Sequence, residues 1–184
     1  MYREQAPDGE MPAVRWLPFQ LNPDLPDAGI SRKEYIERKW GPAGNKYERV
    51  SAVGREVGID FAFDSIKVQP NTVNAHRLML YGTNHGREDE VAESLFAAYF
   101  KEGANIADLK TLADIGARAG LDRKALEAYL ASDEGKDEIL QGDIDARQNG
   151  ISGVPFFIFN RRIGVSGAHE AETLLKAMLD STKD

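Results

Sequence analysis

The stretch Gly150-Ile151-Ser152-Gly153-Val154-Pro155-Phe156-Phe157-Ile158-Phe159 marks a sharp change in the character of the chain. Upstream of it, apolar residues recur at helical spacing, whereas Pro155 to Asn160 is a short continuous apolar run typical of a strand. Arg161 stands where a turn is expected, and Arg162 to Val165 can return as a second strand. The sequence therefore predicts a β-hairpin that is entered through a proline.

A helix is expected on each side of this hairpin. Downstream, Gly167 leads into an amphipathic closing helix with apolar Leu174, Leu175, Met178 and Leu179. Upstream, Gly150 ends a helix predicted from Glu134 to Asn149.

Paired start and stop signals predict a run of further helices between about residues 30 and 150. Ser31 and Glu34 form a capping-box pattern, and Asp108 and Asp122 are N-cap candidates. Gly86 is placed to end a helix in the left-handed conformation. The expected helices lie at about 31–40, 45–57, 72–86, 108–119, 122–130 and 134–149, with one more marked by Val91, Leu95 and Phe96. Residues 60–70 are expected to be a connection.

Near the N-terminus, Ala13 to Phe19 is rich in strand-forming residues, with Val14 and Trp16 on one face. We expect a strand there. The coarse order is then strand, several helices, hairpin and helix.

Composition is that of an ordinary globular protein of 184 residues, with 42% hydrophobic and 29% charged residues. The net charge of −7 carries no basic stripe, which argues against a nucleic-acid partner. No apolar window reaches membrane-spanning length and no signal segment opens the chain, so we expect a cytoplasmic protein without membrane partners. The chain contains no cysteine, which removes disulfides and thiolate nucleophiles.

A family resemblance rests on several separate motifs. The stretch from Gly150 to Phe159, followed by Arg162-Ile163-Gly164-Val165-Ser166-Gly167-Ala168, resembles the proline loop, hairpin and Ser-Gly-Ala turn of DsbA-like thioredoxin-fold proteins of the FrnE type. It is less similar to the 2-hydroxychromene-2-carboxylate isomerases. Segments 15–23, 70–72 and 75–77 resemble the same group.

The resemblance implies an α/β, thioredoxin-like fold with an inserted all-helical domain. Residues 1–25 and 150–184 would form the thioredoxin-like part, and residues 26–149 the helical insertion. The family places a first strand and a Cys-x-x-Cys motif before the strand expected at Ala13 to Phe19, and neither is written in this sequence. We therefore expect an N-terminally incomplete fold, either as a fragment or as a member that fills the gap by dimerisation or with a partner strand.

The same resemblance implies a binding site without a catalytic residue. It predicts a cis bond between Val154 and Pro155, which exposes the Val154 backbone to an extended peptide or to glutathione. Ser152 and Gly153 would shape the approach. His76 and Trp40 are candidates for a cleft, and packing is their alternative role. The histidines, His76, His85 and His169, are too scattered to suggest a metal site.

Three functions follow as hypotheses. The leading one is a cytoplasmic DsbA-like thiol-disulfide oxidoreductase or disulfide isomerase, of which this cysteine-free chain is an inactive part. The alternatives are a glutathione-dependent isomerase of the 2-hydroxychromene-2-carboxylate type and a redox-inert peptide-binding module. Glutathione is the one cofactor that these hypotheses involve. The expected partners are protein or peptide thiols and disulfides, with a homodimer as a further expectation.

Overall fold

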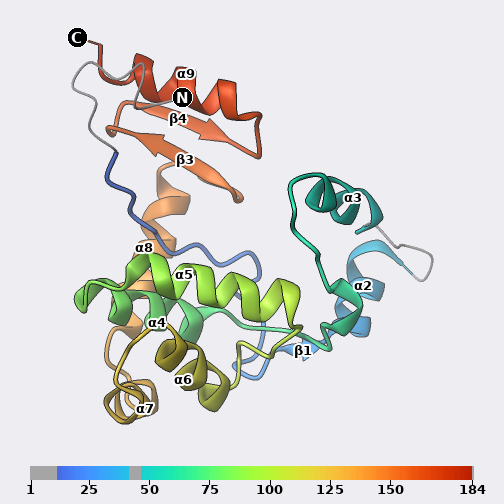
Figure 1. The fold of residues 1–184 in the computed structure, drawn as a ribbon. Coiled ribbons are helices and arrows are strands. Elements are labelled where there is room, and N and C mark those ends of the chain that lie inside the picture. The colour runs from blue at the N-terminus through green and yellow to red at the C-terminus, as the bar shows by residue number, and fades with distance from the viewer. Residues whose placement is uncertain (1–11, 42–46, 184) are drawn as a thin grey trace. The chain divides into compact units, whose positions relative to one another are not determined.

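The computed structural model describes residues 12–41 and 47–183 and divides into two compact units (Figure 1). The helical unit spans residues 22–141. The hairpin unit combines the described part of residues 1–21 with residues 142–184. The boundary between them falls within α8 (Lys136–Gln148), whereas the sequence suggested a boundary after Asn149.

The helical unit contains the expected series of helices together with two very short strands. Its elements are β1 (Ile30–Ser31), α2 (Arg32–Trp40), α3 (Glu48–Glu56), the 3-10 turn η1 (Phe63–Ser65), β2 (Val68–Gln69), α4 (Val73–Asn84), α5 (Glu88–Phe96), the π-helical turn η2 (Ala97–Lys101), α6 (Leu109–Arg118), α7 (Arg123–Ala131) and the start of α8. Residues 60–70 thus hold η1 and β2 in addition to the connection predicted there. β2 pairs antiparallel with β1, with Ile30 opposite Gln69.

The core of this unit lies among α4, α5, α6 and α7. Its largest fully buried side chains come from the inward faces of these helices, namely Leu78, Val91, Leu112, Ile115 and Leu126. Packing is tight at Gly116, where an added Cβ would lie 2.2 Å from Leu126 Cδ2. Each such side chain contributes roughly 1.5–3 kcal/mol by leaving water, so these helices are held together mainly by apolar burial.

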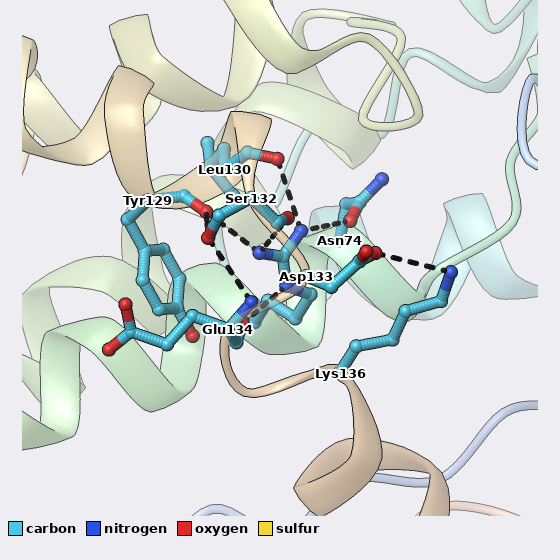
Figure 2. Close-up of polar contacts among 8 residues, drawn as sticks. Asn74, Tyr129, Leu130, Ser132, Asp133, Glu134 and Lys136 are labelled. Atoms are coloured by element: carbon cyan, nitrogen blue, oxygen red, sulfur yellow. Dashed lines mark hydrogen bonds and ion pairs between the residues drawn. The ribbon is translucent and has the colours of Figure 1, made fainter.

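Arg77 of α4 is buried in the same unit and ties α4 to the end of α7. Its Nη2 donates to the carbonyl oxygens of Tyr129 (2.8 Å) and Ser132 (2.7 Å). Its Nη1 donates to Leu130 O (3.2 Å) and Asn74 Oδ1 (2.8 Å), and its Nε donates to Glu134 O (2.9 Å). Figure 2 shows the four carbonyl acceptors gathered at the end of α7 and the turn before α8, with Asn74 close by on α4. All five guanidinium N–H groups are therefore used, mostly on carbonyls at the negative end of a helix.

Two of the predicted helix caps are confirmed. Asp108 Oδ1 accepts from the Thr111 amide (2.8 Å), and Asp122 Oδ1 accepts from the Ala125 amide (2.7 Å). The predicted capping box at Ser31 is wrong, because the Ser31 side chain makes no cap hydrogen bond. Ser31 belongs to β1, and the first amide of α2, from Arg32, donates to Lys67 O (2.9 Å). A backbone carbonyl of the segment before β2, rather than a side chain, therefore accepts from the start of the helix.

The helices around residues 45–86 agree with prediction in part. The predicted start of α3 at Asn45 lies outside the described residues, and its end before Gly58, at φ +78°, is as expected. Its packed position is Gly54, where an added Cβ would lie 2.5 Å from the Phe61 ring. At α4 the N-cap residue Thr72 makes no side-chain cap hydrogen bond, and the neighbouring Asn71 Oδ1 accepts from the Val73 amide instead (2.9 Å).

In the hairpin unit, the predicted hairpin is present as β3 (Phe156–Phe159) and β4 (Ile163–Ser166). The strands are antiparallel, with Phe157 opposite Val165. The turn uses left-handed backbone at Asn160 (φ 49°) and Arg161 (φ 57°). The closing helix α9 (Ala171–Asp180) packs beside β4 (Figure 1).

The strand predicted from Ala13 to Phe19 is wrong, since these residues form no strand ladder with any described residue. A strand needs a partner backbone, and no described residue supplies one to this segment. The hydrogen bonds to side chains of α8 lie just after it, at Gln20. The Gln20 amide donates to Asp143 Oδ1 (2.7 Å), and Arg147 donates from Nη2 to Gln20 O. Leu17, in the middle of the segment, is 73% exposed.

Within the described ranges, each helix is too short or too polar to cross a bilayer.

Candidate functional site

The candidate site begins at the turn that leads from α8 into β3. Gly150, at φ +82°, ends the helical run, and the Ile151 amide donates to Ala146 O (3.0 Å). The Val154–Pro155 peptide bond is cis. Ser152, Val154 and Pro155 are exposed. The four residues expected to bind substrate, 152–155, therefore lie together on one accessible turn.

The main-chain N–H and C=O groups of β3 point alternately to its two edges, and β4 pairs with one of these edges. The Gly167 amide donates to Pro155 O (2.8 Å), which places the polar groups of Pro155 toward β4. Antiparallel strands alternate these directions residue by residue, so Phe157 and Phe159 also point their main-chain groups toward β4. Phe156 and Ile158 then point theirs to the opposite edge, where no described residue forms a further strand.

The side chains of the hairpin separate into a covered face and an open face. Phe157 and Phe159 lie with their rings parallel at 6.4 Å, on the face that carries half-buried Ile163 and Val165. The other face carries Phe156 and Ile158, and Ile158 is 48% exposed. Phe156 lies over Gly164, where an added Cβ would come within 3.1 Å of the ring. The open edge is therefore bordered by apolar groups.

The two cleft candidates lie in the helical unit. His76 is half-buried on α4, and Trp40 ends α2, where its ring meets Tyr47 edge-on at 5.4 Å. Because residues 152–155 belong to the hairpin unit, a common cleft of His76 and Trp40 with that turn stays a prediction.

Sequence reasoning missed the two residues that hold the segment before the helical unit. Asp143 is buried and pairs with Arg147, whose Nε donates to Oδ2 at 3.0 Å. The Arg147 guanidinium also lies 4.5 Å from the Phe19 ring centre. Their i, i+4 spacing on a predicted helix was a usable sign of an ion pair, but nothing in the sequence indicated that Gln20 joins it.

The chemistry available at this turn is binding through backbone groups and apolar contact. The chain has no cysteine and therefore no thiolate to attack a disulfide. Among the described residues, the histidine and acidic side chains form no group of three suited to a metal ion. Extended polypeptide is the ligand that an unpaired strand edge matches best.

The chain belongs to the DSBA-like thioredoxin domain family, whose family model matches residues 3–179. A relative from Bacillus subtilis (strain 168), the uncharacterized protein YwbO, is 24% identical over 185 residues, which cover 98% of this chain and 88% of YwbO. The crystal structure of a probable DsbA oxidoreductase from Streptomyces coelicolor superposes with a TM-score of 0.86 at 24% identity, over 98% of this chain and 81% of that one. The predicted DsbA-like thioredoxin fold is thus confirmed, with mostly helical content.

Proposed function

We propose that this chain is a polypeptide-binding member of the DsbA-like family that performs no thiol-disulfide exchange with groups of its own. The observation that carries the proposal is the open edge of β3, where Phe156 and Ile158 direct their main-chain groups away from β4. The partners would be polypeptides that bear thiols or disulfides, as expected for a relative of DsbA oxidoreductases.

The binding mode would be addition of a strand to β3. A peptide laid along this edge would exchange hydrogen bonds with Phe156 and Ile158, each worth about 0.5–1.5 kcal/mol net. Its side chains would alternate between the two faces of the hairpin, and those on the open face would meet exposed Ile158. Affinity would come from the backbone and from apolar contact, so the sequence preference would be weak and biased toward β-branched residues.

The absence of cysteine defines what the chain does to a bound client. Exchange requires a thiolate that attacks a disulfide sulfur, and this sequence contains none. We expect the protein to bind reduced and alkylated clients as well as unmodified ones. We also expect it not to accelerate the reduction of insulin disulfides by dithiothreitol, so that turbidity develops at the background rate. Acceleration above that background would contradict this part of the proposal.

The test of the binding edge uses two variants at one position. Ile158→Pro removes the N–H that points to the open edge while keeping the β3 groups that bond β4, because proline is tolerated on strand edges. Ile158→Ala keeps that N–H and removes the side chain. In fluorescence anisotropy with a labelled, cysteine-free, Val- and Thr-rich decapeptide, we expect the proline variant to lose binding at least about tenfold.

The alanine variant should lose less than the proline variant, because the backbone supplies most of the affinity. Equal binding by Ile158→Pro and the parent chain, with circular dichroism showing that both are folded, would overturn the proposed edge. Calorimetric titration with glutathione distinguishes the small-molecule alternative, since the proposal predicts no saturable heat at millimolar glutathione.

A further inference from the structure

A second candidate binding site lies in the helical unit, at one face of α2. Arg32, Tyr35 and Lys39 follow one another at helical spacing on this face, and Trp40 and Tyr47 complete the group. The Arg32 guanidinium carbon lies 4.9 Å from the Tyr47 ring centre and 5.5 Å from that of Tyr35. Lys39 Nζ lies 5.3 Å from the Tyr35 ring and 5.1 Å from the Trp40 ring. These five residues are called the Arg32 cluster.

Arg32 is a buried cation with an unused donor. It is 9% exposed, its Nη1 donates to Gln69 Oε1, and its Nε has no hydrogen-bond partner among the described residues. A buried polar group without a partner destabilises the fold, and a charged one does so more strongly.

Arg77 shows how this chain satisfies a buried guanidinium when packing is its whole role. Arg77 is 2% exposed and uses all five donors, on acceptors that include the carbonyls at the end of α7. That end of a helix carries the negative dipole charge, which suits a cation. Arg32 is the first residue of α2, at the positive end of its helix. Its surroundings therefore favour an anion beside it.

The two acidic residues of α2 form ion pairs with basic residues outside the Arg32 cluster. Glu37 pairs with Lys33, and Glu34 pairs with Arg38, so these four charges are used in i, i+4 ion pairs. Among the ion pairs formed between described residues, none involves Arg32 or Lys39. The Arg32 cluster thus brings two positive side chains together, and no carboxylate of the described ranges forms an ion pair with either of them.

The aromatic residues give the cluster apolar walls that solvent can reach. Tyr35, Trp40 and Tyr47 are half-buried, and Lys39 is exposed. The Tyr35 and Trp40 rings meet edge-on, with centres 6.2 Å apart, and the Tyr47 ring stacks on Phe63 at 4.5 Å. Burial raises the pKa of the Tyr47 hydroxyl above its usual range, so that hydroxyl is neutral near pH 7 and remains a hydrogen-bond donor.

We propose that the Arg32 cluster binds a small carboxylate carried on a planar, apolar body. The carboxylate would accept a hydrogen bond from Arg32 Nε, which is buried and has no partner among the described residues, so the half-buried rings would have to admit the ligand to it. Lys39 would add charge, and the rings would lie against the planar body. A planar guanidinium matches a carboxylate in shape, and a monoanion is cheaper to dehydrate than a multiply charged ion. This site is independent of the peptide-binding edge on β3.

The experiment titrates sodium benzoate, as probe, into the full chain carrying Trp16→Phe, so that Trp40 alone reports by fluorescence. We expect saturable quenching with a dissociation constant in the millimolar range or below. Acetate, which lacks the ring, and benzamide, which lacks the charge, should each bind at least about tenfold more weakly. Arg32→Lys should weaken benzoate at least about tenfold, since it keeps the charge and loses the planar fork.

Two further variants keep the proposal testable if Arg32→Lys perturbs folding. Lys39→Gln, at an exposed side chain, should weaken benzoate severalfold without changing the melting temperature. Lys33→Gln, on the ion-paired face of α2, is the matched control and should bind benzoate like the parent. A site with a dissociation constant of about 1 mM would be almost fully occupied at about 20 mM benzoate. Quenching that does not saturate by that concentration, or equal quenching by benzoate and benzamide, would overturn the proposal.

Discussion

The two compact units of this chain differ in how fully their apolar side chains are buried and their polar groups hydrogen-bonded. The helical unit encloses a core of fully buried aliphatic side chains, and its buried Arg77 has every donor bonded. The hairpin unit has two strands, and the side chains of β3, β4 and α9 are at most half-buried. Satisfied groups stabilise a fold, whereas unsatisfied ones remain available to a ligand. The difference indicates that the helical unit holds most of the stabilising core, and the hairpin unit is the one that we propose to bind polypeptide.

The largest expected effect is that of Leu126→Ala in the helical unit. Leu126 is fully buried against Gly116, so truncation leaves a cavity that the close helices cannot collapse. We expect a loss of about 2–5 kcal/mol in the free energy of unfolding. Hydrogen exchange should accelerate in α4 to α7 and leave the β3 and β4 amides unchanged. Equal acceleration in both units would show that their stabilities are not separate.

Arg77→Met should have the next largest effect. The methionine keeps much of the buried volume but leaves the carbonyls of Ser132 and Glu134 without the Arg77 donor, whereas Tyr129 O still accepts from the Ser132 hydroxyl (2.8 Å). We expect about 2–4 kcal/mol of destabilisation, measured by urea unfolding, because each buried acceptor left unpaired costs about 1–3 kcal/mol. Arg118→Gln is the control, since Arg118 is an exposed ion-pair residue, and it should change stability by less than about 0.5 kcal/mol.

A smaller effect is expected from the charge of the Asp108 cap. Hydrogen bonds from the Thr111 amide and hydroxyl lower the pKa of Asp108 below its usual range. A carboxyl whose pKa is lowered by folding stabilises the fold above its unfolded pKa of about 3.9, and this contribution is lost as pH falls through the folded pKa.

Asp108→Asn isolates that charge, because asparagine is itself a good N-cap. Asp108 is largely exposed, so solvent screening should hold the difference below about 1 kcal/mol. Thermal unfolding of both proteins should show the parent as the more stable above about pH 4 and the curves converging at lower pH. A difference that grows on acidification would contradict the sign.

The smallest stability effect is expected for Ile158→Ala in the hairpin unit. Because Ile158 is 48% exposed, its truncation should change the free energy of unfolding by less than about 0.5 kcal/mol while it weakens peptide binding. Hydrogen exchange of the β3 amides together with anisotropy of the labelled decapeptide would measure both quantities. A stability loss comparable with that of Leu126→Ala would remove the contrast between the two units.

The elements that could be predicted from sequence share one property, which is that neighbouring residues specify them. The caps at Asp108 and Asp122 each depend on an amide three residues away, and the hairpin depends on one apolar run and one turn. The predictions at Ser31 and at Ala13 to Phe19 were wrong because both depend on distant parts of the chain. The Arg32 amide donates to Lys67 O, beside strand β2, and no described residue forms a strand next to residues 13–19.

The candidate site divides in the same way. Residues 152–155 lie on one turn because they are consecutive, and the motif around them was visible in the sequence. The Arg32 cluster joins α2 to Tyr47 and Gln69, which no spacing along the chain connects. Its unpaired Nε could be recognised only once the surrounding groups were placed.

The sequence by itself determined the family, the succession of helices, the hairpin after Pro155 and the absence of thiol chemistry, because local periodicity, turn residues and composition are enough to specify them. The tertiary structure decided which polar groups are satisfied. It gave Arg77 five acceptors, whereas no described residue accepts from Arg32 Nε. It also turned the backbone of Phe156 and Ile158 toward an edge of β3 where no described residue forms a strand. Hydrogen bonds between residues far apart in the chain have no periodicity along the sequence, so only the folded arrangement shows which groups remain free to bind.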